Sequence, residues 1–196
     1  MSKFVDSNFY FKAGIDEVGR GALAGNVIAA AVILHPNKII TGLTDSKKIS
    51  SRKRFMLSLE IQENSLAWSY GYANAREIDL LNILQASVLA MQRAVLNLKI
   101  KPNFILVDGK IRLDIKIPYM SIIKGDNLIS EISAASILAK VYRDTEMYKL
   151  SRKLPQYGFE KHKGYPTQHH LEMLKKYGIT KYHRYSFSSV YNILRR

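Results

Sequence analysis

Asp16 and Glu17 are adjacent carboxylates that run directly into Gly19-Arg20-Gly21. Neighbouring carboxylates repel each other, so clustering them is costly unless a cation lies between them. Glycines let a backbone come close to a phosphodiester, and the planar guanidinium of arginine matches a phosphate. The stretch therefore combines a possible metal site with a possible grip on a sugar or phosphate, although a flexible turn would also explain the glycines.

Two further acids, Asp108 and Asp126, follow short apolar segments. Four carboxylates suit Mg²⁺, which prefers oxygen ligands and keeps several waters. Two such ions can activate a water and stabilise the leaving oxygen of a phosphodiester. Taken singly, Asp108 fits a turn after a strand and Asp126 fits a helix N-cap. Their joint occurrence with Asp16 at three expected strand ends favours the metal site.

The segments that must position these acids alternate between strand and helix patterns. We expect strands at 12–18, 26–34, 66–73, 103–107 and 119–123, and helices at 51–64, 81–98 and from 128 to about 150. The small residues at 133–136 would let the last helix lie close to the sheet or to a ligand. This alternation predicts an α/β sheet covered by helices, with sites beyond the carboxyl ends of its strands.

The chain has 196 residues, 47% of them hydrophobic, which suits one domain with a small appendage. Its net charge of +14 points to a polyanionic partner, most simply nucleic acid. The absence of cysteine excludes disulfides, thiolate zinc sites and cysteine nucleophiles. The longest apolar run, Val27–Leu34, is too short to span a bilayer, and residues 1–12 have no signal-peptide core. We expect a soluble, cytoplasmic protein.

Composition divides the chain into residues 1–150, a catalytic core, and residues 151–196, a basic helical part. The second segment holds 10 Lys and Arg against two acids, four of the five His and six of the 12 Tyr. Tyr165 is suited to stacking on a sugar or base, and a packed loop tyrosine is the alternative. Adjacent His169 and His170 would point to different sides of a helix, which argues against a metal pair.

Seven motifs in order resemble bacterial ribonuclease HII. They are Ala13-Gly14-Ile15-Asp16-Glu17-Val18-Gly19-Arg20-Gly21, Asp45-Ser46-Lys47-Lys48, Val107-Asp108-Gly109, Lys124-Gly125-Asp126, residues 132–141, Arg143-Asp144, and His162-Lys163-Gly164-Tyr165-Pro166-Thr167. The resemblance runs from about Ala13 to Ser186, nearly the whole chain. So many motifs in one order are far more specific than any one of them.

The resemblance implies a ribonuclease H-like fold, with a five-stranded mixed sheet flanked by helices and a helical C-terminal part. It implies an endonuclease dependent on Mg²⁺ or Mn²⁺ that cuts the RNA strand of RNA–DNA hybrids. It also implies nicking 5′ to a single ribonucleotide in duplex DNA, which leaves 3′-hydroxyl and 5′-phosphate ends. By motif, the metal-binding catalytic acids would be Asp16, Glu17, Asp108 and Asp126.

The same carry-over assigns the substrate contacts. Gly19, Arg20 and Gly21 would sense the ribose 2′-hydroxyl, Tyr165 would stack on the following deoxyribose, and Lys47 would lie near the scissile region. We expect a monomer that removes ribonucleotides from DNA and helps to remove RNA primers. Two alternatives are a non-catalytic nucleic-acid-binding module, which leaves the acids unexplained, and a related polynucleotidyl transferase, which does not need a 2′-hydroxyl.

Overall fold

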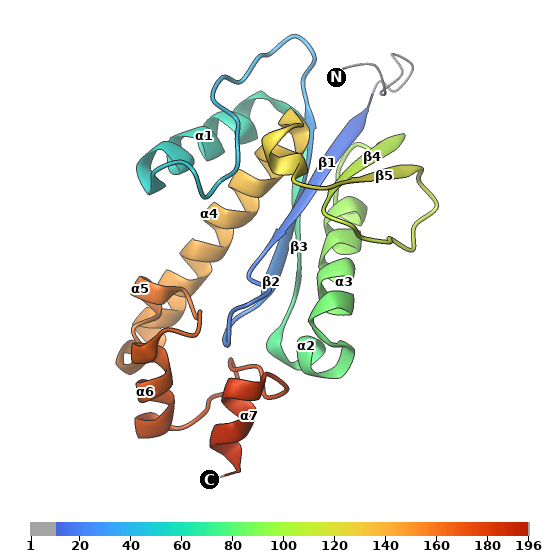
Figure 1. Cartoon of the computed structure of the whole chain (residues 1–196). Coiled ribbons are helices and arrows are strands. Elements are labelled where there is room, and N and C mark those ends of the chain that lie inside the picture. The colour runs from blue at the N-terminus through green and yellow to red at the C-terminus, as the bar shows by residue number, and fades with distance from the viewer. Residues whose placement is uncertain (1–10, 196) are drawn as a thin grey trace.

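Five strands form one mixed sheet in the computed structural model, which describes residues 11–195 (Figure 1). The strands are β1 (Lys12–Val18), β2 (Val27–Leu34), β3 (Ser65–Ala73), β4 (Phe104–Asp108) and β5 (Tyr119–Ile122), in the spatial order β3-β2-β1-β4-β5. β1 pairs antiparallel with β2 and parallel with β4, so the expected mixed sheet is confirmed. Residues 1–12, where we expect no signal-peptide core, lie mostly outside the described residues.

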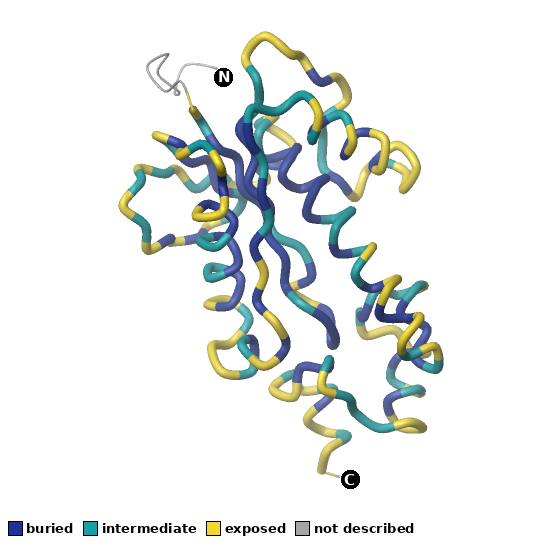
Figure 2. Tube along the Cα trace, turned by 180° about the vertical axis from the view of Figure 1, so that it is seen from behind, coloured by how far each residue is buried: buried dark blue, intermediate teal, exposed yellow. Residues whose placement is uncertain are grey.

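Helices cover both faces of the sheet. α1 (Ser51–Asn64) and α4 (Ser130–Lys153) lie on one face, and α2 (Ala75–Leu81) and α3 (Ile83–Leu96) lie on the other (Figure 1). Along β2, Ala29 and Ala31 pack in the cluster beside α3, whereas Ala30 and Val32 pack in the cluster beside α1 and α4. A strand buried on both faces reads as a continuous apolar run. Figure 2 shows these central strands as mostly buried.

The helix expected over 81–98 is α3, which begins at Ile83, and Leu81 belongs to the preceding helix. Leu81 ends α2, and Asn82 then adopts a left-handed φ of 68°. The Asn82 side chain accepts hydrogen bonds from the backbone amides of Leu84 and Gln85 and so caps α3. With ψ at 164°, this conformation lies outside the left-handed helical region and is unusual for a residue that has a side chain. The two capping hydrogen bonds offset its cost, so the chain turns without a glycine or proline.

The helix α4 crosses directly over β1. A Cβ atom at Gly14 would lie 2.1 Å from the carbonyl carbon of Glu131, so only glycine allows this approach. The small residues 133–136 are all buried, as expected for a helix lying close to the sheet. A 3₁₀ turn, η1 (Gly125–Asn127), precedes α4, which begins at residue 130 rather than 128.

The C-terminal part contains η2 (Pro155–Tyr157), α5 (Phe159–His162), α6 (Gln168–Tyr177) and α7 (Ser188–Leu194), which gather at one end of the molecule (Figure 1). Its apolar cluster includes Leu23 and Ala24 from the loop after β1. The expected boundary at residue 150 falls within the last turn of α4, which continues to Lys153. Within residues 11–195, no helix is long and apolar enough to cross a membrane.

Candidate active site

Asp16 and Asp108 come together because β1 and β4 are neighbouring parallel strands. Ile15 lies opposite Val107 in the register, and the two acids follow directly. Ile15 and Val107 both pack in the cluster beside α3. Successive residues of a strand point to opposite faces, so Asp16 and Asp108 point toward the α4 side of the sheet.

Asp126 reaches the same place from η1 rather than from the end of a strand. β5 stops at Ile122, so the expectation that this strand itself carries the acid is wrong. The backbone amide of Gly125 donates a 2.7 Å hydrogen bond to the Asp108 carboxylate. The Ser133 hydroxyl donates to the Asp126 carbonyl at 2.6 Å. These two bonds hold the turn between β4 and α4 and place Asp126 beside Asp108.

Glu17 leaves β1 on the side opposite Asp16, because it is the next residue of the strand. Its register partner, Ala29, belongs to the cluster beside α3. The Glu17 carboxylate accepts a 3.3 Å hydrogen bond from the Arg20 guanidinium. The structure therefore groups three of the four expected acids on the α4 face and places Glu17 at the end of the strand, against the loop.

Burial and mutual repulsion make this cluster costly in its ionised form. Burial, and then the charge of Glu17, hold the pKa of Asp16 well above its usual value. Burial, and then the Asp108 charge, raise the pKa of Asp126. Burial also raises the pKa of Glu17, although the Arg20 charge opposes the shift. A bound cation would favour all three ionised forms.

The donor set fits a hard divalent cation. Every candidate ligand is a carboxylate oxygen, which is the ligand that Mg²⁺ and Mn²⁺ favour. The pKa values of Asp16 and Asp126 are raised, so the nearby positive charges, including Lys47, do not fully offset burial and repulsion. Among residues 11–195, however, no three acid or histidine side chains are drawn together into a complete metal-ligand group. Asp16, Asp108 and Asp126 are nevertheless close enough for their charges to interact.

The Gly-Arg-Gly loop, residues 19–21, lies next to Tyr165. A Cβ atom at Gly21 would lie 3.8 Å from the Tyr165 ring. The Leu23 amide donates a 2.8 Å hydrogen bond to the Gly164 carbonyl, which ties the two loops together. The Arg20 and Gly21 amides donate to no other group in the described part of the chain. They are therefore available as donors beside the acids.

Lys47 lies on the Asp126 side of the acids. Its positive charge acts to lower the pKa of Asp126, and its backbone amide donates to the Asp45 side chain at 2.9 Å. The ammonium group of the next residue, Lys48, donates to the side-chain oxygen of Asn127 in η1. The segment around Lys47 therefore borders the turn that carries Asp126.

Two buried arginines, Arg143 and Arg184, had no role assigned from the sequence. Both lie beneath the loop that follows β1. For Arg143 a signal was present, since residues 136, 139, 143, 147 and 150 form a buried stripe of α4 at helical spacing. A charged residue in such a stripe calls for an explanation. Arg184 lies in an irregular segment that offers no comparable pattern.

The histidines of the C-terminal part form a packed cluster. The Nε2 atoms of His170 and His183 lie 3.2 Å apart, and both side chains are fully buried. The His162 ring stacks on His170 with centroids 4.5 Å apart. His169 is exposed on the other side of α6. His169 and His170 thus point in different directions, as helical geometry requires.

Comparison with known proteins places this geometry in context. The family model for ribonuclease HII matches residues 13–190. The crystal structure of ribonuclease H2 from Pyrococcus horikoshii OT3 is similar, with a TM-score of 0.82, 26% identity, and coverage of 95% of this chain and 98% of that one. The ribonuclease HII of the PCNA complex from Archaeoglobus fulgidus has a TM-score of 0.77, 25% identity, and coverage of 91% and 95%.

A more distant structure shares the fold. Bst-RNase HIII, solved in complex with Mn²⁺, has a TM-score of 0.71 and 17% identity, and the match covers 94% of this chain and 69% of that one.

Proposed function

The chain belongs to the ribonuclease HII family, and on that premise we propose that it nicks duplex DNA on the 5′ side of a single ribonucleotide and cuts the RNA strand of RNA–DNA hybrids. Membership makes it a metal-dependent ribonuclease H. The observation that carries the finer proposal is the position of Tyr165 and the Gly-Arg-Gly loop, side by side next to the buried acids. Such a site would combine a cleavage centre with a surface that distinguishes ribose from deoxyribose.

Asp16, Glu17, Asp108 and Asp126 are the proposed metal ligands, with Mg²⁺ or Mn²⁺ as the proposed ions. When bound, two such ions supply activation of the attacking water and stabilisation of the leaving 3′-oxygen. The protein holds Asp16 and Asp108 on rigid neighbouring strands and Asp126 on a turn pinned by the Gly125 amide. Rigid placement of this kind lowers the reorganisation that the reaction requires.

Recognition of the ribonucleotide falls to the loop after β1. The 2′-hydroxyl is the group that distinguishes RNA from DNA at a given site, and it can both donate and accept a hydrogen bond. The Arg20 and Gly21 amides are donors without a protein acceptor among the described residues. Gly21 has no side chain to block close approach. Tyr165, half-buried beside it, presents a ring on which the next sugar can stack.

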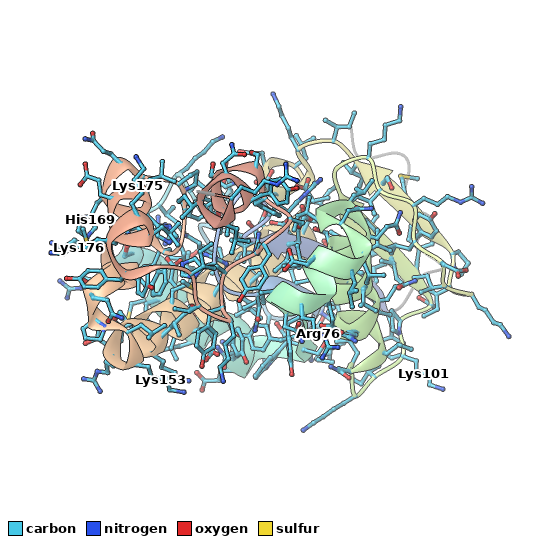
Figure 3. The ribbon with its side chains drawn as sticks, turned by 90° about the horizontal axis from the view of Figure 1, so that it is seen from below. Arg76, Lys101, Lys153, His169, Lys175 and Lys176 are labelled. Atoms are coloured by element: carbon cyan, nitrogen blue, oxygen red, sulfur yellow. The ribbon has the colours of Figure 1, made fainter. Side chains whose placement is uncertain are left out.

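We propose that the duplex lies along the basic C-terminal part, residues 151–196, and that binding the duplex is the role of this part. We also propose that the protein acts as a monomer. Figure 3 shows His169, Lys175, Lys176 and Lys153 on the side of the molecule formed by α6 and the end of α4. Arg76 and Lys101 lie away from them. Lysines contact phosphates without reading sequence, so the affinity would weaken as salt increases. Lys47 would add a contact near the scissile bond.

A labelled DNA duplex with one embedded ribonucleotide tests the proposal. We expect a single nick 5′ to the ribonucleotide with Mg²⁺ or Mn²⁺, ends that carry 3′-hydroxyl and 5′-phosphate groups, and no nick in EDTA. An all-DNA duplex should remain intact. Cleavage of long hybrids without a nick at the single ribonucleotide would contradict the proposed recognition of a ribonucleotide followed by a deoxyribonucleotide. Binding without any cleavage, under either metal, would leave only a nucleic-acid-binding module. Removal of ribonucleotides and primers is the proposed role.

A further inference from the structure

Arg143 is a buried cation with no carboxylate partner. Its side chain on α4 is only 1% exposed. In the described part of the chain no acid lies within ion-pair distance of it, and its neighbour Asp144 pairs instead with Arg54 and Lys140. Burying an unpaired charge is expensive, so such a residue persists only where its donors are satisfied in another way.

Backbone carbonyls from two distant segments satisfy the Arg143 guanidinium. Nε donates to the Asn26 carbonyl at 3.2 Å, and Nη2 donates to the Ala24 carbonyl at 3.2 Å. Nη1 donates to the Lys163 carbonyl at 2.9 Å. Only a planar fork of donors can reach three acceptors in these directions at once. The side chain therefore joins the loop after β1 to the loop that carries Tyr165.

The same guanidinium touches both proposed substrate-binding elements. Its Cζ atom lies 5.3 Å from the centroid of the Tyr165 ring, a cation–π distance. At Gly19, where φ is 95°, an added Cβ atom would lie 2.2 Å from the Arg143 Nε. The Gly-Arg-Gly loop therefore rests directly on Arg143, and Tyr165 packs against it.

A second buried arginine completes the support. Arg184 donates to the Arg20 carbonyl at 2.8 Å and twice to the Gly25 carbonyl, at 3.1 and 2.9 Å. Burial, and then the nearby Arg143 charge, lower its pKa to about 9. The two cations are held close together against repulsion, and the acceptors are mainly carbonyls of residues 20–26. Four carbonyls of this loop, those of residues 20, 24, 25 and 26, therefore accept hydrogen bonds from buried guanidinium groups.

We propose that Arg143 is a positioning residue that fixes the separation between the Gly-Arg-Gly loop and Tyr165, and thereby sets the preference for a single ribonucleotide over a continuous hybrid. This inference rests on the proposed function. A single ribonucleotide offers one 2′-hydroxyl followed by one deoxyribose. The Gly-Arg-Gly loop and Tyr165 must therefore be the correct distance apart to contact both sugars at once. A continuous hybrid offers many 2′-hydroxyls. It could therefore still bind in a position that allows cleavage when the Gly-Arg-Gly loop and Tyr165 are less firmly held.

The test removes the guanidinium group and keeps an unbranched side-chain stem. Arg143→Met removes all the donors, and Arg143→Lys retains the charge but not the fork. The control is Arg76→Met, an exposed arginine on α2 that lies away from Lys153 and the lysines of α6. We expect both Arg143 variants to lose about tenfold or more in cleavage at a single ribonucleotide, because small misplacements of reactive groups are costly. Their cleavage of a long hybrid should fall much less, and Arg76→Met should match the parent protein.

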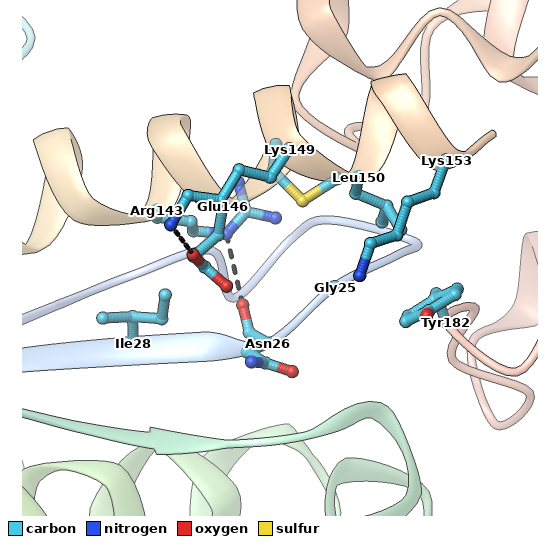
Figure 4. Close-up of a pocket in the computed structure, with 10 residues that line it drawn as sticks. Gly25, Asn26, Ile28, Arg143, Glu146, Lys149, Leu150, Lys153 and Tyr182 are labelled. Carbon is cyan, nitrogen blue, oxygen red and sulfur yellow. Dashed lines mark hydrogen bonds and ion pairs between the residues drawn. The ribbon is translucent and has the colours of Figure 1, made fainter. Parts of the chain in front are cut away.

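Added guanidinium provides a rescue arm. Arg143 borders a pocket of about 160 Å³, also lined by Asn26, Lys153 and Tyr182 (Figure 4). Millimolar guanidinium should therefore reach the space vacated in Arg143→Met and restore part of the single-ribonucleotide cleavage. Equal losses on both substrates, or full activity of Arg143→Lys, would overturn the proposal. Rescue is expected for Arg143→Met, and added guanidinium should leave Arg76→Met unchanged.

A readout without activity separates this inference from the proposed function. In Arg143→Lys, hydrogen exchange should accelerate at the amides of residues 20–26 and 162–166 and stay unchanged in β1 and β4. If the parent protein failed to nick single ribonucleotides, the proposed function would fall while this exchange pattern still tested the positioning. Unchanged exchange in both loops would sink the positioning role even with the enzyme intact.

Discussion

Two glycines near the acids, Gly14 and Gly21, lie in opposite surroundings. At Gly14 an added Cβ atom would overlap the backbone of α4, with the nearest atom of Glu131 at 2.1 Å. At Gly21 the nearest neighbour of a Cβ atom would be the Tyr165 ring at 3.8 Å, an ordinary contact. Gly14 therefore allows α4 to lie directly on β1, whereas Gly21 leaves open space beside the Tyr165 ring, which we propose as the approach for the substrate.

We predict opposite results for the two alanine substitutions. Gly14→Ala should lower the free energy of unfolding by about 3 kcal/mol or more, because backbone must move to admit the new atom. Gly21→Ala should leave the melting temperature nearly unchanged and reduce single-ribonucleotide cleavage about tenfold or more, by blocking close approach. Thermal melts and initial rates measure the two effects. A stable, fully active Gly21→Ala protein would refute the access role of Gly21.

The elements that meet at the site were partly predictable. Strand and helix periodicity located β1, β2, α1 and β3 to within a residue or two, because their apolar spacing is strong. The break at Asn82 was not predictable, because a single left-handed asparagine leaves the apolar pattern intact. Asp126 was expected at a strand end and lies in a 3₁₀ turn, since short turns carry little pattern. The carbonyl-bound arginines depend on contacts between segments far apart in sequence.

The buried histidine chain ties two C-terminal segments to the Tyr165 loop. His183 Nδ1 accepts from the Thr180 backbone amide at 3.1 Å, so the proton of the neutral ring lies on Nε2. That Nε2–H donates to His170 Nε2, and His170 Nδ1–H donates to the Tyr165 carbonyl at 3.0 Å. Each of the two rings therefore has one tautomer that fits. A second proton on His170 would place an N–H group on each of the two facing Nε2 atoms, which repel each other.

Stability should therefore fall in mild acid. Burial lowers the pKa of His170 and of His183 to about 4, below the ordinary 6.5. Between those values the unfolded chain binds protons that the native state does not, so the free energy of unfolding falls as pH drops from about 6.5 toward 4. The stabilising effect is fully present above about pH 7. By pH 5 we expect a loss of roughly 1 to 2 kcal/mol for each histidine.

Urea unfolding at pH 7.5, 6 and 5 measures this loss. His183→Gln should be less stable than the parent protein at pH 7.5 and should show a shallower decline toward pH 5. The exposed His169→Gln protein is the control and should follow the parent curve. The acids of the site, whose pKa values are raised, act in the opposite sense and are common to all three proteins. Parallel curves for His183→Gln and the parent would contradict the neutral chain.

On the scale of the whole molecule, a strongly basic chain surrounds a small acidic centre. The net charge of +14 predicted a polyanionic partner, and motif order predicted the family, which the match over residues 13–190 confirms. The mixed sheet followed from that resemblance and is confirmed. The assembly of the site could not be predicted, because Asp16 and Asp108 meet only through strand register. Tyr165 reaches the Gly-Arg-Gly loop only through the packing of the C-terminal part on the loop after β1.

The central claim is that the four acids form the catalytic centre, whereas the basic surface binds the nucleic acid. The Asp16→Asn protein tests this claim most directly. The change removes one charge and keeps the shape, and Asp114→Asn makes the same change at an exposed loop acid. Both proteins are compared with the parent for hybrid affinity and for cleavage in Mg²⁺. We predict that Asp16→Asn binds with near-parent affinity and cuts about 10² to 10³ times more slowly, since several kcal/mol of transition-state stabilisation depend on the metal ligands. Asp114→Asn should cut normally. Cleavage by Asp16→Asn within a few-fold of the parent would contradict the assignment of this cluster as the catalytic centre.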